Sequence, residues 1–343
     1  SKEPSIFARQ FNGFKTGRDA WCYDASLNNL RQKIDRMITF FNSEVSRLSD
    51  VEDRENAVDL ASNDDTRISW NRSLKNDLRR SRHLDFDQNA PRTITYRPFL
   101  EQWGYVDRPL NDLVSIVEKA SPTPTSENVF LMVSGIGSNK GFTTFLTKNV
   151  PDVQLLFNGQ CFPLWSYIDD GTLSEGSLFE GLSKEPTRSH SITDAGLKHF
   201  QDAYLGETIT KEDLFYYVYG LLHSEDYRAK YADNLSKELP RIPRVKTAAD
   251  FWAFSRAGRE LGDLHVNYET VDPYPVTIKQ GDLRLADIKN PETFYRVTKW
   301  AFGKTGKEKD KTTVIYNANM TMQDIPLEAY DYVVNGKPAL EWV

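Results

Sequence analysis

The chain has 343 residues, of which 39% are hydrophobic and 27% are charged, and its formal net charge is −6. This composition is typical of a globular protein, and the length allows two lobes with substantial cores. No apolar run approaches the roughly 18 residues of a membrane helix, the first residues do not form a signal peptide, and two cysteines cannot build a disulfide framework. We therefore expect a cytoplasmic protein without membrane contact.

The charge is unevenly distributed along the chain. The segment from Phe41 to Asp65 contains eight acidic and two basic residues, whereas the segment from Arg67 to Arg97 contains eight basic and three acidic residues. A second basic stretch, from Arg296 to Lys311, has six bases and two acids. The negative total argues against nucleic-acid binding, but the two basic stretches keep such binding open.

The first predicted element is a long amphipathic helix. Apolar residues recur at three- and four-residue spacing from Leu27 to Leu48, with Asp24 or Ser26 as the cap. The acidic tract that follows is expected to be a solvated helix face or a loop. A basic helix is predicted from Thr66 to Arg82, and its outward arginines serve either solubility or phosphate contact.

Strand patterns begin at Thr93 and break at Pro98. An apolar strand from Val129 to Ser134 leads into a glycine-rich stretch, 135–141. This stretch is no phosphate-binding loop, because Lys140 precedes its last glycine, and the third glycine of a dinucleotide motif comes one position late. A hairpin turn is the simplest interpretation, and a DNA-contacting loop is the alternative.

The rest of the chain alternates between strand-rich and helical segments. Further strands are expected at Leu155, at Phe157 and from Cys161 to Tyr167, followed by a long turn from Asp169 to Ser191. Helices are expected from 193 to 262. The tail is expected to contain strands at 276–278, 283–285, 297–301 and 312–316, then a short helix over 325–330.

The segment Ile209 to Arg244 shows the clearest helix signals. Thr210 and Asp213 resemble a capping box, Ser224 can cap a second helix, and Pro240 and Pro243 should stop it. The four aromatic residues in this segment suit core packing, with base stacking as the alternative; they are Phe215, Tyr216, Tyr217 and Tyr219.

The amino-acid sequence of this segment resembles that of the C-terminal specificity region of Type ISP single-polypeptide restriction-modification enzymes. Other motifs with the same resemblance occur in the family's order across nearly the whole chain: Phe14 to Trp21, Ile94 to Arg108, Gly159 to Leu164, Asp250 to Phe254, Leu264 to Glu269, and Leu340 to Trp342. The resemblance implies a recognition region that follows a methyltransferase part.

Motifs for catalysis are missing from the sequence. No Asn/Asp-Pro-Pro-aromatic tetrapeptide of an adenine methyltransferase occurs, and Pro151-Asp152 lacks the Glu-x-Lys partner of a nuclease motif. The five histidines show no metal-ligand spacing. His223, at a helix end where a positive ring would suit the dipole, and His265, in a strand-like run, are expected to be structural. We expect no catalytic residue, metal or cofactor in this chain.

The predicted fold is α+β, with an N-terminal spacer helix, a β-rich recognition lobe, a helical middle and a β-containing C-terminal lobe. The corresponding boundaries are 1–65, 66–191, 192–262 and 263–343. The function that the resemblance implies is sequence-specific recognition of double-stranded DNA, with the methyltransferase and helicase/nuclease parts of the parent polypeptide as partners. The alternatives are an interaction scaffold without DNA binding, and a hydrolase with a dispersed site.

The candidate DNA-binding residues fall into two classes. Phosphate contacts would set the register without reading sequence, and hydrogen bonds to base edges in the major groove would read it. The phosphate candidates are Arg72, Lys75, Arg79, Arg80 and Arg82; the base-reading candidates are Arg97, Ser138, Asn139 and Lys140.

Overall fold

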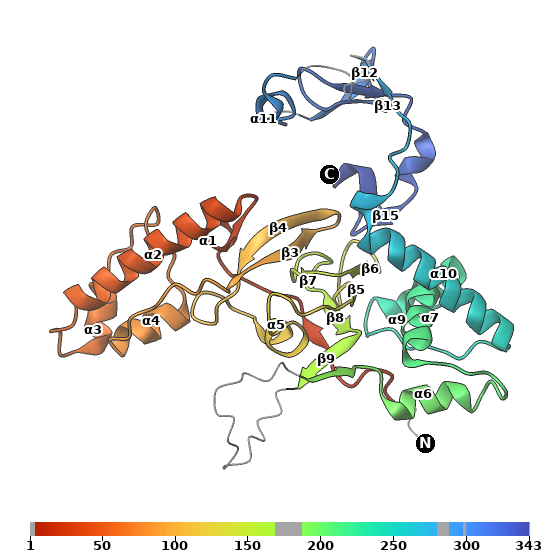
Figure 1. Cartoon of the computed structure of the whole chain (residues 1–343), viewed down its shortest axis with the longest axis horizontal. Helices are drawn as coiled ribbons and strands as arrows, with labels where there is room; N and C mark the ends of the chain where they lie inside the picture. Colours follow the sequence, from red (N-terminus) through yellow and green to blue (C-terminus); the bar gives the residue numbers. More distant parts are fainter. Residues whose placement is uncertain (1–3, 169–186, 280–287, 298–299, 343) are drawn as a thin grey trace. The chain divides into compact units, whose positions relative to one another are not determined.

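The computed structural model describes residues 4–168, 187–279, 288–297 and 300–342. The chain divides into two compact units, Ser1–Tyr268 and Glu269–Val343. Helices and several separate sheets occur together, which confirms the predicted α+β class (Figure 1). The division into four functional segments, 1–65, 66–191, 192–262 and 263–343, stays a prediction.

The long helix α2 (Leu27–Arg47) matches the predicted spacer helix. The Ser26 side chain accepts a hydrogen bond from the Asn29 amide, so Ser26 is the N-cap. The apolar positions of α2, among them Leu30, Ile34 and Phe41, are buried. This stripe packs against three shorter helices, and together they form the helical lobe: α1 (Asp19–Cys22), α2, α3 (Arg54–Asp59) and α4 (Arg72–Arg79).

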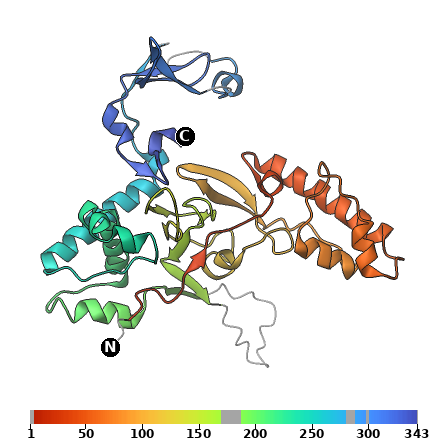
Figure 2. The same ribbon diagram turned by 180° about the vertical axis from the view of Figure 1, so that it is seen from behind.

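The basic helix α4 is shorter than the predicted range 66–82. Asn71 caps it, because its side-chain oxygen accepts from the Leu74 amide at 2.8 Å. Arg54 at the start of α3 joins α3 to the end of α2 and to α4, because its guanidinium donates to the carbonyls of Leu48 and Leu78. Figures 1 and 2 show this lobe and the helices α6–α10 on opposite sides of the central strands.

Two four-stranded sheets form the centre of the first unit. One has the order β2-β4-β3-β7 and contains a parallel pair, β3 with β7. The other has the order β1-β8-β5-β6 and is antiparallel throughout. The strand bounds are β1 Phe11–Asn12, β2 Tyr23–Asp24, β3 Pro91–Arg97, β4 Leu100–Tyr105, β5 Phe130–Val133, β6 Thr144–Thr147, β7 Val150–Pro151 and β8 Gln160–Pro163.

Two strand predictions need comment. Leu155 and Phe157 lie in a turn rather than in a strand, and Phe157 and Asn158 have positive φ angles of 38° and 50°. The predicted turn over 169–191 lies outside the described residues up to 186, and its end is a strand. That strand, β10 (Thr187–His190), pairs with β9 (Trp165–Ile168) as a separate two-stranded ribbon.

The helical region confirms the capping predictions. Thr210 and Asp213 form a capping box at the start of α7, and Ser224 caps α8, as predicted. The structure also shows Thr247 as the cap of α10. The four aromatic residues of α7 are buried, which confirms their packing role. The last helix before the prolines ends at Leu235, ahead of Pro240. The bounds are α6 Asp194–Gln201, α7 Lys211–His223, α8 Glu225–Lys230, α9 Ala232–Leu235 and α10 Ala248–Val266.

Helices α7 and α10 approach closely because glycines lie at their crossing. A Cβ atom built on Gly258 would lie 2.0 Å from the Tyr216 carbonyl oxygen, and one on Gly220 would lie 2.2 Å from that of Phe254. Only glycine fits at such a contact between two backbones. The short helix α5 (Ser115–Ala120) packs against β9 and β1.

The second unit is built on a small antiparallel sheet of order β11-β14-β13-β12. The predicted terminal helix is a 3-10 helix, η3 (Leu327–Tyr330), and the predicted strand 283–285 lies outside the described residues. The bounds are β11 Thr277–Ile278, α11 Pro291–Phe294, β12 Ala301–Thr305, β13 Glu308–Ile315, β14 Thr321–Gln323, β15 Val333–Val334 and β16 Lys337–Pro338, with 3-10 turns η1 Tyr268–Thr270 and η4 Ala339–Glu341. Across the described part of the chain, no helix has the length and apolar character to cross a membrane.

The structure confirms that His223 ends a helix, and it corrects two expectations, the strand-like setting of His265 and the positive ring of His223. His265 lies in the last turn of α10, not in a strand, and its Nδ1 contacts the Tyr219 hydroxyl. Burial, followed by the neighbouring His223, lowers the pKa of His265 to about 3. Burial also lowers the pKa of His223 to about 4, so its ring is neutral rather than a positive partner of the helix dipole.

These two histidines should make the first unit sensitive to acid. Their folded-state pKa values lie below the unfolded value of about 6.5, so the unfolded chain takes up protons first as the pH falls. Their contribution to stability is complete above about pH 6.5 and decreases toward their folded pKa values. Chemical denaturation measures how much the free energy of unfolding decreases between pH 7.5 and pH 5.0. This decrease should be about 2 kcal/mol smaller for His223→Gln than for the unaltered chain.

The matched control is His83→Gln, because His83 is exposed. It should keep the pH dependence of the unaltered chain. An identical loss of stability in the unaltered chain and in His223→Gln would contradict the account of the half-buried His223 ring.

Candidate nucleic-acid interface

The outer face of α4 brings three of the predicted phosphate-contacting residues together. Leu74 and Leu78 are buried, which turns Arg72, Lys75 and Arg79 outward at spacings of three and four residues. The three cations line a shallow cavity of about 470 Å³, together with Trp70, Asn71 and Asn76. Local amphipathicity therefore accounts for this basic face.

Two of the five residues predicted to contact phosphates already form ion pairs with acidic neighbours. The Arg79 guanidinium lies 2.7 Å from the Glu55 carboxylate of α3, and Arg82 lies 3.6 Å from Asp77. The exposed side chains of Arg72, Lys75 and Arg80 form no ion pair with any residue that the structure describes. These three cations are therefore the ones available to an anionic ligand.

Arg97 is half-buried and is held by a carboxylate and an aromatic ring. Its guanidinium lies 2.9 Å from the buried carboxylate of Asp152 and 3.8 Å from the centre of the Tyr96 ring. The Tyr23 hydroxyl donates a second hydrogen bond to Asp152 at 2.8 Å. Burial raises the pKa of Asp152, and the Tyr23 hydrogen bond and the Arg97 charge oppose that rise. Arg97 thus has a structural partner that sequence reasoning missed.

The glycine-rich stretch is the connection of the β5–β6 hairpin, which confirms the hairpin prediction. Asn139 and Lys140 are exposed, and Ser138 is half-buried. Gly137 has a φ of 79°, and its amide donates to the Ser236 carbonyl after α9 at 3.3 Å. The turn is therefore attached to the helical region, and it presents an amide and an ammonium group at a supported position.

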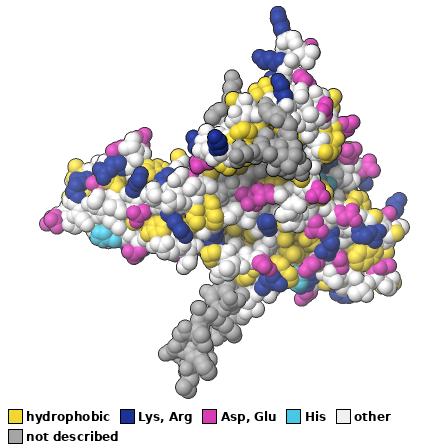
Figure 3. All heavy atoms as spheres, turned by 45° about the horizontal axis from the view of Figure 1, so that its top comes forward, with side chains coloured by type: hydrophobic (Ala, Val, Ile, Leu, Met, Phe, Trp, Pro, Cys, Tyr) yellow, Lys and Arg dark blue, Asp and Glu magenta, His cyan; other side chains and the backbone are white. Residues whose placement is uncertain are grey.

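The nine predicted site residues form two groups and one separate residue. The α4 group belongs to the helical lobe, and the hairpin group lies beside the helical region, while Arg97 ends β3 between them. In the space-filling view, Lys and Arg side chains on the helical lobe alternate with Asp and Glu (Figure 3). The surface of this lobe therefore has mixed charge, and single unpaired cations on it are available to an anionic ligand.

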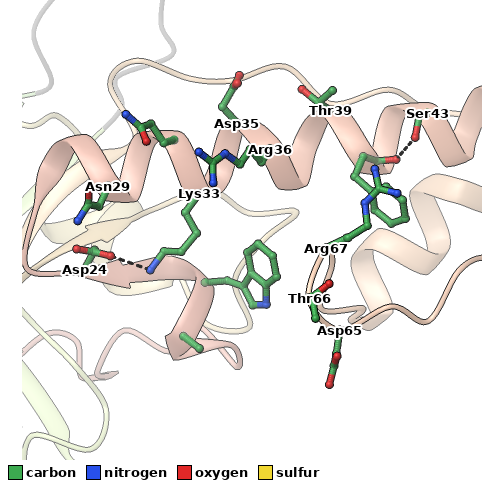
Figure 4. Close-up of a pocket in the computed structure, with 14 residues that line it drawn as sticks. Asp24, Asn29, Lys33, Asp35, Arg36, Thr39, Ser43, Asp65, Thr66 and Arg67 are labelled. Carbon is green, nitrogen blue, oxygen red and sulfur yellow. Dashed lines mark hydrogen bonds and ion pairs between the residues drawn. The ribbon is translucent and has the colours of Figure 1, made fainter.

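A larger groove of about 1000 Å³ follows one side of α2 and was not predicted from the sequence. Figure 4 shows Lys33 pointing toward Asp24, with Arg36 on the same helix and Arg67 on the facing segment. Lys33 lies 3.1 Å from Asp24, and Arg67 lies over the Phe40 ring at 4.1 Å. Because three cations and three acids line the groove, it does not favour an anion over a mixed polar ligand; the acids are Asp24, Asp35 and Asp65.

No group suited to hold a metal ion is found among the described histidines, cysteines, aspartates and glutamates. Both cysteines, Cys22 and Cys161, are buried, and burial raises the pKa of each thiol. A buried thiol with a raised pKa is a poor nucleophile.

Replacing Arg97 should reveal its structural role. Arg97→Ala would leave the Asp152 carboxylate buried with one partner fewer, so the free energy of unfolding should fall by about 3 kcal/mol. Arg108→Ala is the matched control, because Arg108 forms an exposed ion pair with Glu118, and it should cost less than about 1 kcal/mol. Equal effects in urea denaturation would contradict the structural role of Arg97.

Comparisons with known proteins agree over the whole chain. The family model of the Type ISP C-terminal specificity domain matches residues 5–343. Among solved structures, a nuclease-deletion mutant of the Type ISP restriction-modification enzyme LlaGI, in complex with a DNA substrate mimic, is 32% identical with a TM-score of 0.81. The ATP-dependent Type ISP enzyme LlaBIII bound to DNA is 30% identical with a TM-score of 0.81, and DrdV in a DNA complex is 28% identical with a TM-score of 0.82.

These similarities cover the chain but only part of each relative. The chain is covered over 100%, 100% and 98%, whereas 28% of the LlaGI chain, 20% of the LlaBIII chain and 31% of the DrdV chain are covered. No curated protein matches the sequence. The family model alone spans nearly every residue, and the chain belongs to the Type ISP C-terminal specificity domain family.

Proposed function

We propose that this chain recognises a double-stranded DNA target on behalf of a restriction-modification polypeptide. The observation that carries the proposal is the similarity of the whole chain to relatives that were solved with DNA or a DNA mimic, at TM-scores of 0.81 and 0.82. The methyltransferase, helicase and nuclease parts of such a polypeptide would be its partners. The chain itself would contribute recognition without catalysis, metal or cofactor.

Phosphate contact would come from the free cations of the helical lobe. Arg72, Lys75 and Arg80 are exposed and have no acidic partner in the described part of the chain, so a phosphate would be their first strong anionic ligand. Such contacts release counterions and fix the position of the protein on the duplex, but they carry no sequence information. Arg79 and Arg82 would contribute less, because Glu55 and Asp77 already neutralise them.

Base reading would come from the tip of the β5–β6 hairpin. Asn139 can present its amide to adenine N6 and N7, and Lys140 can donate to guanine O6 and N7. Ser138 would support the turn, since its hydroxyl accepts from the Lys140 amide at 3.3 Å. Arg97 would be a weaker candidate, because reading a base would require it to leave the buried carboxylate of Asp152.

Reversing two free charges on α4 tests the phosphate role. Arg72→Glu with Lys75→Glu should weaken binding to all duplex sequences alike and lower the salt slope of log Kd by about 2, one for each lost contact. Fluorescence anisotropy on several unrelated duplexes across a salt series measures both quantities. The order of preference among the duplexes should stay unchanged.

The matched control is Lys246→Glu with Arg256→Glu, which changes the net charge equally at exposed positions near and within α10. It should affect the salt slope less than the α4 variant does. An equal effect of both variants would mean that only net charge matters. Altered base preference in the α4 variant would contradict a role confined to phosphates.

A further inference from the structure

The β9–β10 ribbon presents a set of side chains on one face that the proposed function leaves unexplained. The register pairs Trp165 with His190 and Tyr167 with Arg188. Because alternate residues of a strand point to the same side, these four side chains share one face of the ribbon. The ribbon joins none of the three four-stranded sheets that the structure describes. A two-stranded ribbon of this kind is narrow enough to enter the major groove of DNA.

Arg188 is held in place by an aromatic ring and not by an acid. Its guanidinium carbon lies 4.1 Å from the centre of the Trp165 ring, and the His190 ring lies 3.9 Å from the same ring. Arg188 is exposed and forms no ion pair with any described residue. This distinguishes it from Arg79 and Arg97, whose charges are matched by carboxylates.

Strand β9, which pairs with the strand that carries Arg188, is firmly attached to the body of the protein. The buried Asn128 side chain accepts from the Trp165 amide at 3.0 Å and donates to the Trp165 carbonyl at 2.7 Å. The Tyr167 hydroxyl donates to the Glu127 carbonyl at 2.7 Å. A cation on such a support has a defined position, which is what reading a base edge requires and what general attraction to phosphates does not.

We propose that this ribbon face is a further DNA-contacting element and that Arg188, positioned by Trp165, reads a guanine in the major groove. The inference rests on the proposed function and adds a specificity-determining residue to it. Arginine is suited to this role because its planar fork of donors can bond O6 and N7 of guanine together. Trp165 is a positioning residue here, and His190 packs on it.

The test compares Arg188→Lys and Arg188→Gln with the unaltered chain by selection and sequencing of bound randomised duplexes, followed by anisotropy on the selected site. Lysine keeps the charge and loses the planar fork, so both variants should lose the preference for guanine at one position by roughly tenfold. If Arg188 contacted only a phosphate, Arg188→Lys would keep the full sequence preference, and that result would overturn the proposal. Arg256→Lys, on the exposed side of α10, is the matched control.

The same experiment separates this inference from the proposed function. An unaltered chain that selects a motif, together with Arg188 variants that select the same motif equally well, would overturn the ribbon proposal alone. An unaltered chain that binds no duplex would overturn both. Trp165→Phe keeps a ring beneath Arg188, and it should change the guanine preference less than Arg188→Gln does; the reverse order would contradict the positioning role of Trp165.

Discussion

The arrangement of the first unit depends on one buried carboxylate. Asp152 is 3% exposed, and it accepts hydrogen bonds from the Tyr23 hydroxyl, the Arg97 guanidinium and the Gln154 amide. Its own amide donates to the Thr95 carbonyl, and its neighbour Pro151 accepts from the Phe14 amide. A buried charge persists only with such partners, so the carboxylate joins β2 and β3 to the segment 151–154. The backbone of that segment in turn bonds Phe14, which follows β1. The junction thereby connects the β2-β4-β3-β7 sheet, on which α2 packs, to the chain that leaves β1 of the second sheet.

The candidate contact surfaces follow from this junction and from the local distribution of acids. Figure 1 shows α4 on one side of β3 and β7, and β5 and β6 on the other. The side chains available to a ligand are those that no neighbouring acid pairs with. Glu55 and Asp77 already pair with Arg79 and Arg82, so these two arginines are less available. The net charge of −6 therefore says little about binding, because the unpaired charges decide it.

Local features of the fold were predictable from the sequence, and non-local ones were not. The stripe on α2, the capping box at Thr210 and the β5–β6 hairpin depend on residues a few positions apart. The Arg97–Asp152 pair joins residues 55 positions apart, and no local signal shows it. The ribbon was missed in part because β10 begins in a stretch rich in polar residues, where its pairing with β9 decides the structure. His265 was misplaced because its helix continues beyond the last clear apolar repeat.

Selection from randomised duplex DNA, with sequencing of the bound fraction, tests the central claim most directly. The chain should enrich a short motif in a salt-dependent manner, and Asn139→Ala with Lys140→Ala should lose the preference at part of that motif while keeping the salt slope. Salt-dependent binding without an enriched motif would mean that the hairpin does not read bases in this chain. Absence of binding at low salt would contradict the account as a whole and favour a scaffold role.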